Sequence, residues 1–225
     1  MASGSLAEES RATARDKAWH FTLFMRYSLV IADLGGVVVH VDSDRLIHQV
    51  AQLVGKPFEE VQQAVYHEEL LLPFEIGRIK PQAYYEGLKA RLKLRWSYEQ
   101  FVAAWNGIFT ENQDVIWIMR RLRERHKLIV LSNTNELHIN HIKASMPSLS
   151  IFHDWIASCE VGLRKPDPQI YRLALERSGA RAGTAVYIDD RPELVDAGRS
   201  LGLTGIRFES SQQLEDDLRA IGLNV

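Results

Sequence analysis

The hydrophobic pattern of the chain changes twice along its length. Residues 27–41 are mostly apolar and β-branched, interrupted by Gly35 and Gly36, which predicts a strand buried on both faces and then a tight loop. From about residue 44 to residue 106, apolar residues recur instead at helical spacing. The predicted helices of this region cover residues 44–55, 58–71, 80–92 and 97–109. Together they predict a helical insert over residues 43–107.

After the insert, helix-like and strand-like segments alternate. Helices are predicted over residues 114–126, 168–179 and 193–202, and strands over residues 127–134, 183–190 and 203–208. This alternation is typical of a parallel sheet with right-handed crossover helices. We therefore predict an α/β protein with a Rossmann-like parallel sheet. The predicted domains are a core of residues 26–42 and 108–225, the helical insert, and a poorly ordered N-terminal extension of residues 1–25.

Composition and charge narrow the choice of partners. With 46% hydrophobic residues, 25% charged residues and a net charge of −2, the chain offers no basic surface for nucleic acid or an anionic membrane. The single Cys159 cannot form an internal disulfide, as is usual in a reducing compartment. The chain has no apolar run of the roughly 20 residues that a membrane span needs, and its first residues do not resemble a secretory signal. We expect a cytoplasmic monomer or homodimer that acts on a small molecule.

Carboxylates stand at the ends of two predicted strands. Asp33 follows the first strand, and Asp189 and Asp190 end the strand over residues 183–190. Ligands of such sheets bind outside the carboxyl ends of the strands, where Gly35 and Gly36 allow the backbone to turn sharply toward a ligand. Converging carboxylates suit a hard cation such as Mg²⁺. Asp33 could therefore serve as a nucleophile or as a metal ligand.

Three further polar residues extend this pattern. Ser132 and Asn133, at the end of another predicted strand, offer a hydroxyl and an amide that can hydrogen-bond an anion. Lys165 stands between prolines and supplies a positive charge suited to a phosphate or to a crowded pair of carboxylates. Taken singly, such residues are also typical of turns, helix caps and solvated surfaces. His138 and His141 are expected on a solvated helix face because no third metal ligand accompanies them.

Four motifs carry a family resemblance that covers nearly the whole chain after Met25. They read DLGGVVV, VLSNTN, RKPDPQIY and YIDDR, and in this order they resemble the four motifs of the haloacid dehalogenase-like hydrolases. The helical insert resembles the small cap of that superfamily. Its segments FEIGRIKPQAYYEGL and SYEQFVAAWNGIF are similar to those of bacterial sugar-phosphate phosphatases, the branch that includes alpha-D-glucose-1-phosphate phosphatases.

The resemblance implies a role for each candidate residue. Asp33 would be the nucleophile that accepts the phosphoryl group, with Ser132 and Lys165 as its catalytic partners. The implied substrate or phosphate contacts are Ser132, Asn133, Gly35, Gly36, Lys165 and, from the insert, Arg78. The implied Mg²⁺ ligands are Asp33, the Gly35 carbonyl, Asp190 and Asp189, the last directly or through water.

One departure from the superfamily pattern bears on mechanism. Most phosphatases of the superfamily carry a second aspartate two positions after the nucleophile, as general acid and base, and here that position is Gly35. A substrate with a good leaving group, such as a sugar anomeric hydroxyl, would need that acid less. A halide would not need it at all. A smaller departure is Leu194, where relatives usually have asparagine.

Three functions remain open from the sequence. We expect Mg²⁺-dependent hydrolysis of small phosphate monoesters, in particular sugar phosphates, through an aspartyl-phosphate on Asp33. The alternatives are a haloacid dehalogenase that uses Asp33 and a weakly active homologue that acts as a binding protein. The adjacent acids Asp189 and Asp190 favour the phosphatase, because halide displacement brings no phosphate charge for a metal to offset.

Overall fold

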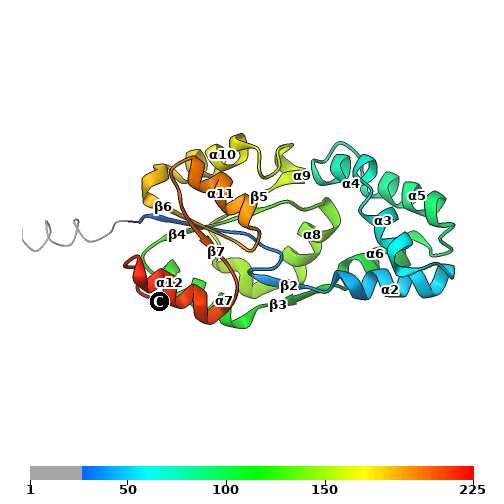
Figure 1. Ribbon diagram of the computed structural model, residues 1–225, viewed down its shortest axis with the longest axis horizontal. Coiled ribbons are helices and arrows are strands. Elements are labelled where there is room, and N and C mark those ends of the chain that lie inside the picture. Colours follow the sequence, from blue (N-terminus) through cyan, green and yellow to red (C-terminus); the bar gives the residue numbers. More distant parts are fainter. Residues whose placement is uncertain (1–26) are drawn as a thin grey trace, which may run out of the picture.

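The computed structural model describes residues 27–225, so the expected N-terminal extension, residues 1–25, lies outside the described residues. Its main feature is a five-stranded parallel sheet in the order β5-β4-β1-β6-β7 (Figure 1). The strands are β1 Leu29–Ala32, β4 Lys127–Ser132, β5 Asp154–Ala157, β6 Ala185–Asp189 and β7 Thr204–Arg207. The predicted parallel α/β architecture is confirmed, with β1 at the centre of the sheet.

Helices cover both faces of this sheet, as Figure 1 shows. One face carries α7 Gln113–Arg123, α8 Glu136–Ser145, α12 Ser211–Ala220 and the 3-10 helix η1 Pro147–Ile151; the other carries α10 Pro168–Ser178 and α11 Pro192–Ser200. Two further elements are short: α9 Ser158–Val161 directly follows β5, and the 3-10 helix η2 Ala182–Thr184 directly precedes β6. Val30 and Ala32 pack into the hydrophobic core on the face covered by α7, while Leu29 and Ile31 pack into the core on the face covered by α10. The central strand β1 thus buries both of its faces, which explains the continuous apolar pattern of residues 29–32.

The helical insert has a hydrophobic core of its own. Its helices are α2 Ser43–Val54, α3 Phe58–Val65, α4 Glu68–Glu75, α5 Pro81–Leu92 and α6 Tyr98–Asn106. Aromatic rings form the centre of this core: Phe74 stacks on Tyr84 at 4.5 Å between centroids, and Trp105 lies 5.1 Å from Tyr84. The buried Tyr84 hydroxyl donates a hydrogen bond of 2.9 Å to the Val65 carbonyl. Figure 1 shows these helices as a lobe beside the carboxyl ends of the sheet strands.

Several elements differ from the sequence prediction. The strand expected over residues 27–41 is β1, a loop, and a separate β2 Val39–Val41 that pairs antiparallel with β3 Phe109–Glu111 where the chain returns from the insert. The single helix predicted over residues 58–71 is divided between α3 and α4. The elements β5 and α12 were not predicted, because β5 has only four residues and α12 is largely polar. Among residues 27–225, none of the helices has the length and apolar character needed to cross a bilayer.

Candidate active site

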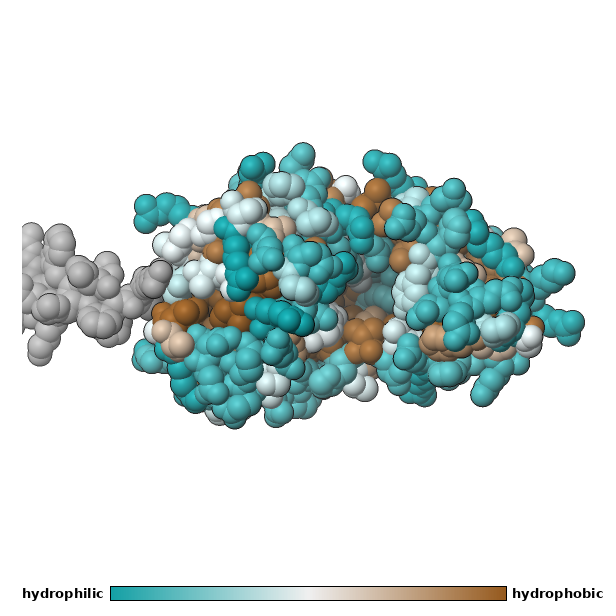
Figure 2. Space-filling view, in the orientation of Figure 1, coloured by the Kyte–Doolittle hydropathy of each residue, from teal (hydrophilic) through white to brown (hydrophobic). Residues whose placement is uncertain are grey.

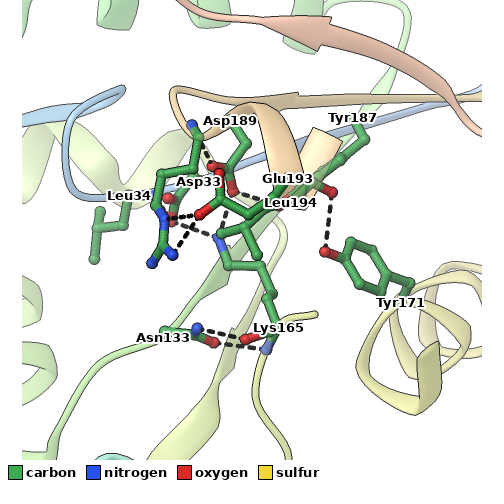
Figure 3. Close-up of polar contacts among 10 residues, drawn as sticks. Asp33, Leu34, Asn133, Lys165, Tyr171, Tyr187, Asp189, Glu193 and Leu194 are labelled. Atoms are coloured by element: carbon green, nitrogen blue, oxygen red, sulfur yellow. Dashed lines mark hydrogen bonds and ion pairs between the residues drawn. The ribbon is translucent and has the colours of Figure 1, made fainter. Parts of the chain in front are cut away.

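The predicted strand-end residues meet at one edge of the sheet. Asp33 follows β1, Ser132 ends β4 and Asp189 ends β6. Because β4 and β6 are the two neighbours of β1, residues far apart in the sequence reach the same crevice. Lys165 comes from the loop before α10 and completes the cluster (Figure 3).

A buried lysine joins two of the carboxylates. Lys165 Nζ lies 2.9 Å from Asp33 Oδ1 and 2.7 Å from Asp189 Oδ2, and only 1% of the lysine side chain is exposed. The Lys165 backbone is itself held by Asn133, whose Oδ1 accepts from the Lys165 N–H at 2.7 Å while its Nδ2 donates to the Lys165 carbonyl at 2.9 Å (Figure 3). The amide predicted to bind phosphate is therefore engaged in positioning the lysine.

Burial dominates the electrostatics of Asp33. Removal from water raises the pKa of its carboxyl to about 7, while the nearby Lys165 opposes that rise and Asp189 adds to it. Its Oδ1 also accepts a hydrogen bond of 2.6 Å from the Leu34 N–H. A carboxylate so far from water is stabilised by cations, so the position favours an additional positive charge.

The two adjacent acids of the fourth motif have different environments. Asp189 is fully buried, and its oxygens accept from Lys165 Nζ, the Tyr187 hydroxyl and the Arg191 N–H. Asp190 is half-buried and lines a cavity, and burial raises the pKa of its carboxyl, as does the adjacent Asp189. Asp189 therefore holds the lysine, whereas Asp190 faces the space where a ligand can bind.

The carboxylates are close enough to share a cation. Oxygen atoms of Asp33, Asp189 and Asp190 all lie within 4.8 Å of one another. Gly36, with φ +81°, leaves room beside them, because a Cβ at this position would lie 2.5 Å from Asp190 Oδ2. Hard oxygen donors around a space kept open by a glycine fit an ion such as Mg²⁺.

A cavity of about 270 Å³ lies over these residues. Asp33, Gly35, Ser132, Asn133, Lys165 and Asp190 all line it. Arg78 does not: it is exposed and lines a separate hollow with Leu163 and Asp167. Arg164 and Arg191 are the guanidinium groups that line the cavity. The structure thus brings together all the predicted site residues of the sheet domain, although Gly36 and Asp189 do not line the cavity themselves, and it leaves Arg78 outside.

One contact between insert and sheet domain at the cavity was not anticipated from the sequence. Glu75, at the end of α4, lies 3.0 Å from Arg164, and burial raises the pKa of the glutamate against the effect of that arginine. The Glu75 carbonyl accepts a 2.6 Å hydrogen bond from the Ser158 hydroxyl. Two residues further on, a Cβ at Gly77 would lie 2.2 Å from the Cys159 carbonyl oxygen, so only glycine allows this close approach. In the sequence, the segment FEIGR of residues 74–78 is the feature from which this contact could have been anticipated.

A second contact joins α6 to α8. The His138 ring stacks on Trp105 at 5.0 Å, and its Nε2 lies 3.1 Å from the Trp105 carbonyl. Asn135 Nδ2 lies 3.0 Å from His138 Nδ1, and Asn135 Oδ1 accepts from Trp105 Nε1 at 3.4 Å. Burial lowers the pKa of His138 to about 3, which makes the neutral ring the stable form. The solvated helix face expected for His138 is therefore wrong, because the ring is enclosed between insert and sheet domain.

Comparison with known proteins places this geometry in a family. A family model described as haloacid dehalogenase-like hydrolase matches residues 27–202. D-ribitol-5-phosphate phosphatase of Bacteroides thetaiotaomicron is 22% identical over 200 residues, which cover 85% of this chain and 97% of that protein. Flavin mononucleotide hydrolase 1 of Arabidopsis thaliana is 37% identical over 78 residues, and this chain spans only 32% of its length.

Solved structures share the fold. The magnesium complex of a HAD family enzyme from Bacteroides thetaiotaomicron superposes with a TM-score of 0.77 at 23% sequence identity, covering 86% of this chain and 99% of that one. At this identity the similarity concerns the arrangement of sheet and helices. The chemistry must be argued from the residues at the edge of the sheet.

Proposed function

Because the chain belongs to the haloacid dehalogenase-like hydrolases, we propose that its Asp33, Lys165, Ser132 and Asp190 form the active site of a Mg²⁺-dependent phosphatase for small phosphate monoesters. The observation that carries this proposal is the buried Lys165 bridging Asp33 and Asp189, with Asp190 beside them on the cavity. One relative that is named a phosphatase, D-ribitol-5-phosphate phosphatase, supports the same reaction class.

Asp33 is the proposed nucleophile. An oxygen of its carboxylate forms a bond to phosphorus while the bond from phosphorus to the ester oxygen breaks, and the alcohol leaves with its electron pair and takes a proton from water. Water then attacks the phosphorus of the aspartyl-phosphate, which releases inorganic phosphate and restores the carboxylate. Lys165 lies close enough to Asp33 to favour its ionised form and to offset part of the phosphoryl charge.

The remaining residues position the charges. Ser132 contributes a hydroxyl for a phosphoryl oxygen, and Asn133 fixes the backbone of Lys165. The proposed Mg²⁺ ligands are Asp33, Asp190 and the Gly35 carbonyl. Asp189 already accepts three hydrogen bonds, so its proposed role is to position Lys165 rather than to bind the metal directly. When bound there, Mg²⁺ supplies positive charge that lets an anionic phosphate approach an anionic carboxylate.

Two alternatives make different demands on the same residues. A haloacid dehalogenase would use Asp33 as its nucleophile. It would not need Asp190 as a cation ligand, because its substrate brings no phosphate charge for a cation to offset. A binding protein would retain the cavity without turnover. The family resemblance by itself suggests sugar phosphates, and ribitol phosphate, the substrate named for one relative, is a related polyol phosphate. The apolar residues that line the insert side of the cavity favour a less polar alcohol portion.

Phosphate release from a panel of esters, with Mg²⁺ and with EDTA, tests the proposal. We expect turnover only with Mg²⁺, and a loss of at least ~10³-fold in kcat for Asp33→Asn, which keeps the shape but removes the nucleophile. Asp196→Asn is the matched control, because Asp196 is an exposed aspartate of α11 that pairs with Arg199 and does not line the cavity. Full activity of Asp33→Asn would exclude its role. Halide release without phosphate release would identify a dehalogenase, and saturable ester binding without turnover would identify a binding protein.

A further inference from the structure

We infer that the preferred substrate is a phosphate monoester whose alcohol portion is apolar, an alkyl or aryl group rather than a free polyol. This inference rests on the proposed phosphatase function and concerns the part of the same cavity that faces the insert. The floor of the cavity is polar, with Asp33, Lys165 and Asp190. The opposite wall has a different character, and the alcohol portion must lie against it once the phosphoryl group meets Asp33.

Apolar side chains make up most of that wall. It is lined by Val41, Leu46, Leu71, Ile108, Phe109 and Ile142. These residues come from β2, α2, α4, α8, β3 and the turn that precedes β3. Ser43 and Glu75 of the insert also line the cavity, but the apolar residues form the larger part of this wall. Burying an apolar group against them is favourable, and they offer no hydrogen-bond partner to a hydroxyl.

The apolar surface continues to the mouth of the cavity. Val41 is 42% exposed and Tyr66 is 43% exposed, and both line the cavity. Large apolar side chains are otherwise mostly buried in residues 27–225, so two of them at the rim of one cavity form a local exposed patch. Figure 2 shows hydrophobic residues gathered around the hollow between the two lobes.

Several polar groups near this wall are engaged with one another. Trp105 Nε1, the Asn135 amide and both His138 nitrogens form one closed network. Glu75 forms an ion pair with Arg164, although Glu75 Oε2 and Arg164 Nε have no hydrogen-bond partner within residues 27–225. A sugar or other polyol brings several hydroxyls that each need a partner, and the network of Trp105, Asn135 and His138 could supply partners only by breaking its own contacts. An apolar alcohol leaves the network intact.

The apolar wall reaches the position where a general acid would stand. A Cβ on Gly35 would lie 3.1 Å from Val41 Cγ2, so a valine methyl group occupies the space beside that glycine. An alcohol portion bound beside Gly35 would therefore have an apolar neighbour.

Two esters with similar leaving groups separate the effect of binding to the apolar wall from the effect of leaving-group reactivity. We would compare kcat/KM for n-hexyl phosphate and glucose 6-phosphate with Mg²⁺, because both are esters of primary alcohols and differ mainly in the body of the alcohol. Aryl esters are unsuitable here, since their better leaving group would raise the rate by itself. We expect n-hexyl phosphate to be favoured by at least ~10-fold, the scale of one or more methylenes in an apolar pocket.

Substitutions in the wall test which residues produce the preference. Val41→Thr keeps the shape of the side chain but adds a hydroxyl, and Leu71→Asn does the same on α4 at similar length. Each is expected to lower the ratio of kcat/KM for hexyl over glucose ester by about tenfold. Leu53→Asn is the matched control: Leu53 is a 45% exposed leucine of the insert that does not line the cavity, so the ratio should not change. Thermal unfolding of each variant checks that it is folded.

The outcomes separate the two proposals. A higher kcat/KM for glucose 6-phosphate, or the same change of ratio in Leu53→Asn as in Leu71→Asn, would overturn the apolar substrate and leave the phosphatase standing. Failure of the unmodified protein to release phosphate from either ester, or from a wider panel with Mg²⁺, would overturn the proposed function itself.

Discussion

Replacing Gly36 by alanine tests whether the position of Asp190 controls metal binding. Gly36 lies at φ +81°, where an L side chain costs about 1–2 kcal/mol. The new Cβ would also lie 2.5 Å from Asp190 Oδ2. Restoring an ordinary contact of 3.4 Å requires Asp190 to move by about 0.9 Å.

A displacement of this size matters more for function than for folding. A misplacement of about 1 Å in an active site can cost on the order of 10²-fold in rate. We therefore expect Gly36→Ala to lower kcat/KM by about that factor and to raise the Mg²⁺ concentration needed for half-maximal activity. The free energy of unfolding without metal should fall by only about 1–2 kcal/mol from backbone strain.

Gly55→Ala is a matched control for the strain. Gly55 ends α2 at φ +66°, and a Cβ there would meet no atom within 4 Å. The two variants should lose similar stability in urea unfolding, whereas only Gly36→Ala should lose activity and Mg²⁺ response. Equal activity in both variants, or an unchanged Mg²⁺ dependence in Gly36→Ala, would refute the argument that Asp190 is a positioned metal ligand.

Three further predictions concern other contacts of the site. Asn133→Ala removes both hydrogen bonds to the Lys165 backbone, so kcat should fall more than KM rises; steady-state kinetics with an unaltered kcat would contradict this. Gly35→Asp should gain little activity on alkyl esters because Val41 crowds it, whereas the same change combined with Val41→Ala should exceed Val41→Ala alone when initial rates are compared. For His138, the pKa of about 3 in the folded protein lies below the usual histidine value of 6.5, so the unfolded chain binds an extra proton between these pH values. Stability therefore falls as pH falls through that window, by up to ~1.4 kcal/mol per pH unit. Urea unfolding at pH 7 and pH 5 should show a smaller fall for His138→Gln than for the unmodified chain, and equal falls would exclude this role.

The convergence of the motifs could be predicted from the sequence because strand order follows simple rules. Asp33, Ser132 and Asp189 each end a strongly apolar segment, and in a parallel sheet such ends share one edge. The division of labour between Asp189 and Asp190 could not be predicted in the same way. It depends on which carboxylate turns toward Lys165, a side chain supplied by a loop from another part of the chain.

Which side chains of the insert face the cavity could not be predicted from the sequence either. Its helices were recognisable from their period, but the positions that face the cavity depend on how the helices pack around Phe74 and Tyr84. Arg78 carried the expected charge and lies elsewhere, while Glu75, three residues earlier, borders the cavity. His138 was assigned to solvent because nothing in the local sequence indicates that Trp105, on a separate helix, would cover it.

The antiparallel pair β2–β3 also has a consequence for the order of folding. Leu29 must pair with Lys127, which lies 98 positions further along the chain. Once the insert has folded and His40 faces Thr110, the ends of the insert are neighbours, and only about 30 positions of flexible chain separate the two sheet strands. Loop-closure entropy grows with the logarithm of length, so this shortening lowers the cost of closing the loop by about 1 kcal/mol. The insert that forms the wall of the cavity thereby also helps the central strands of the sheet to meet.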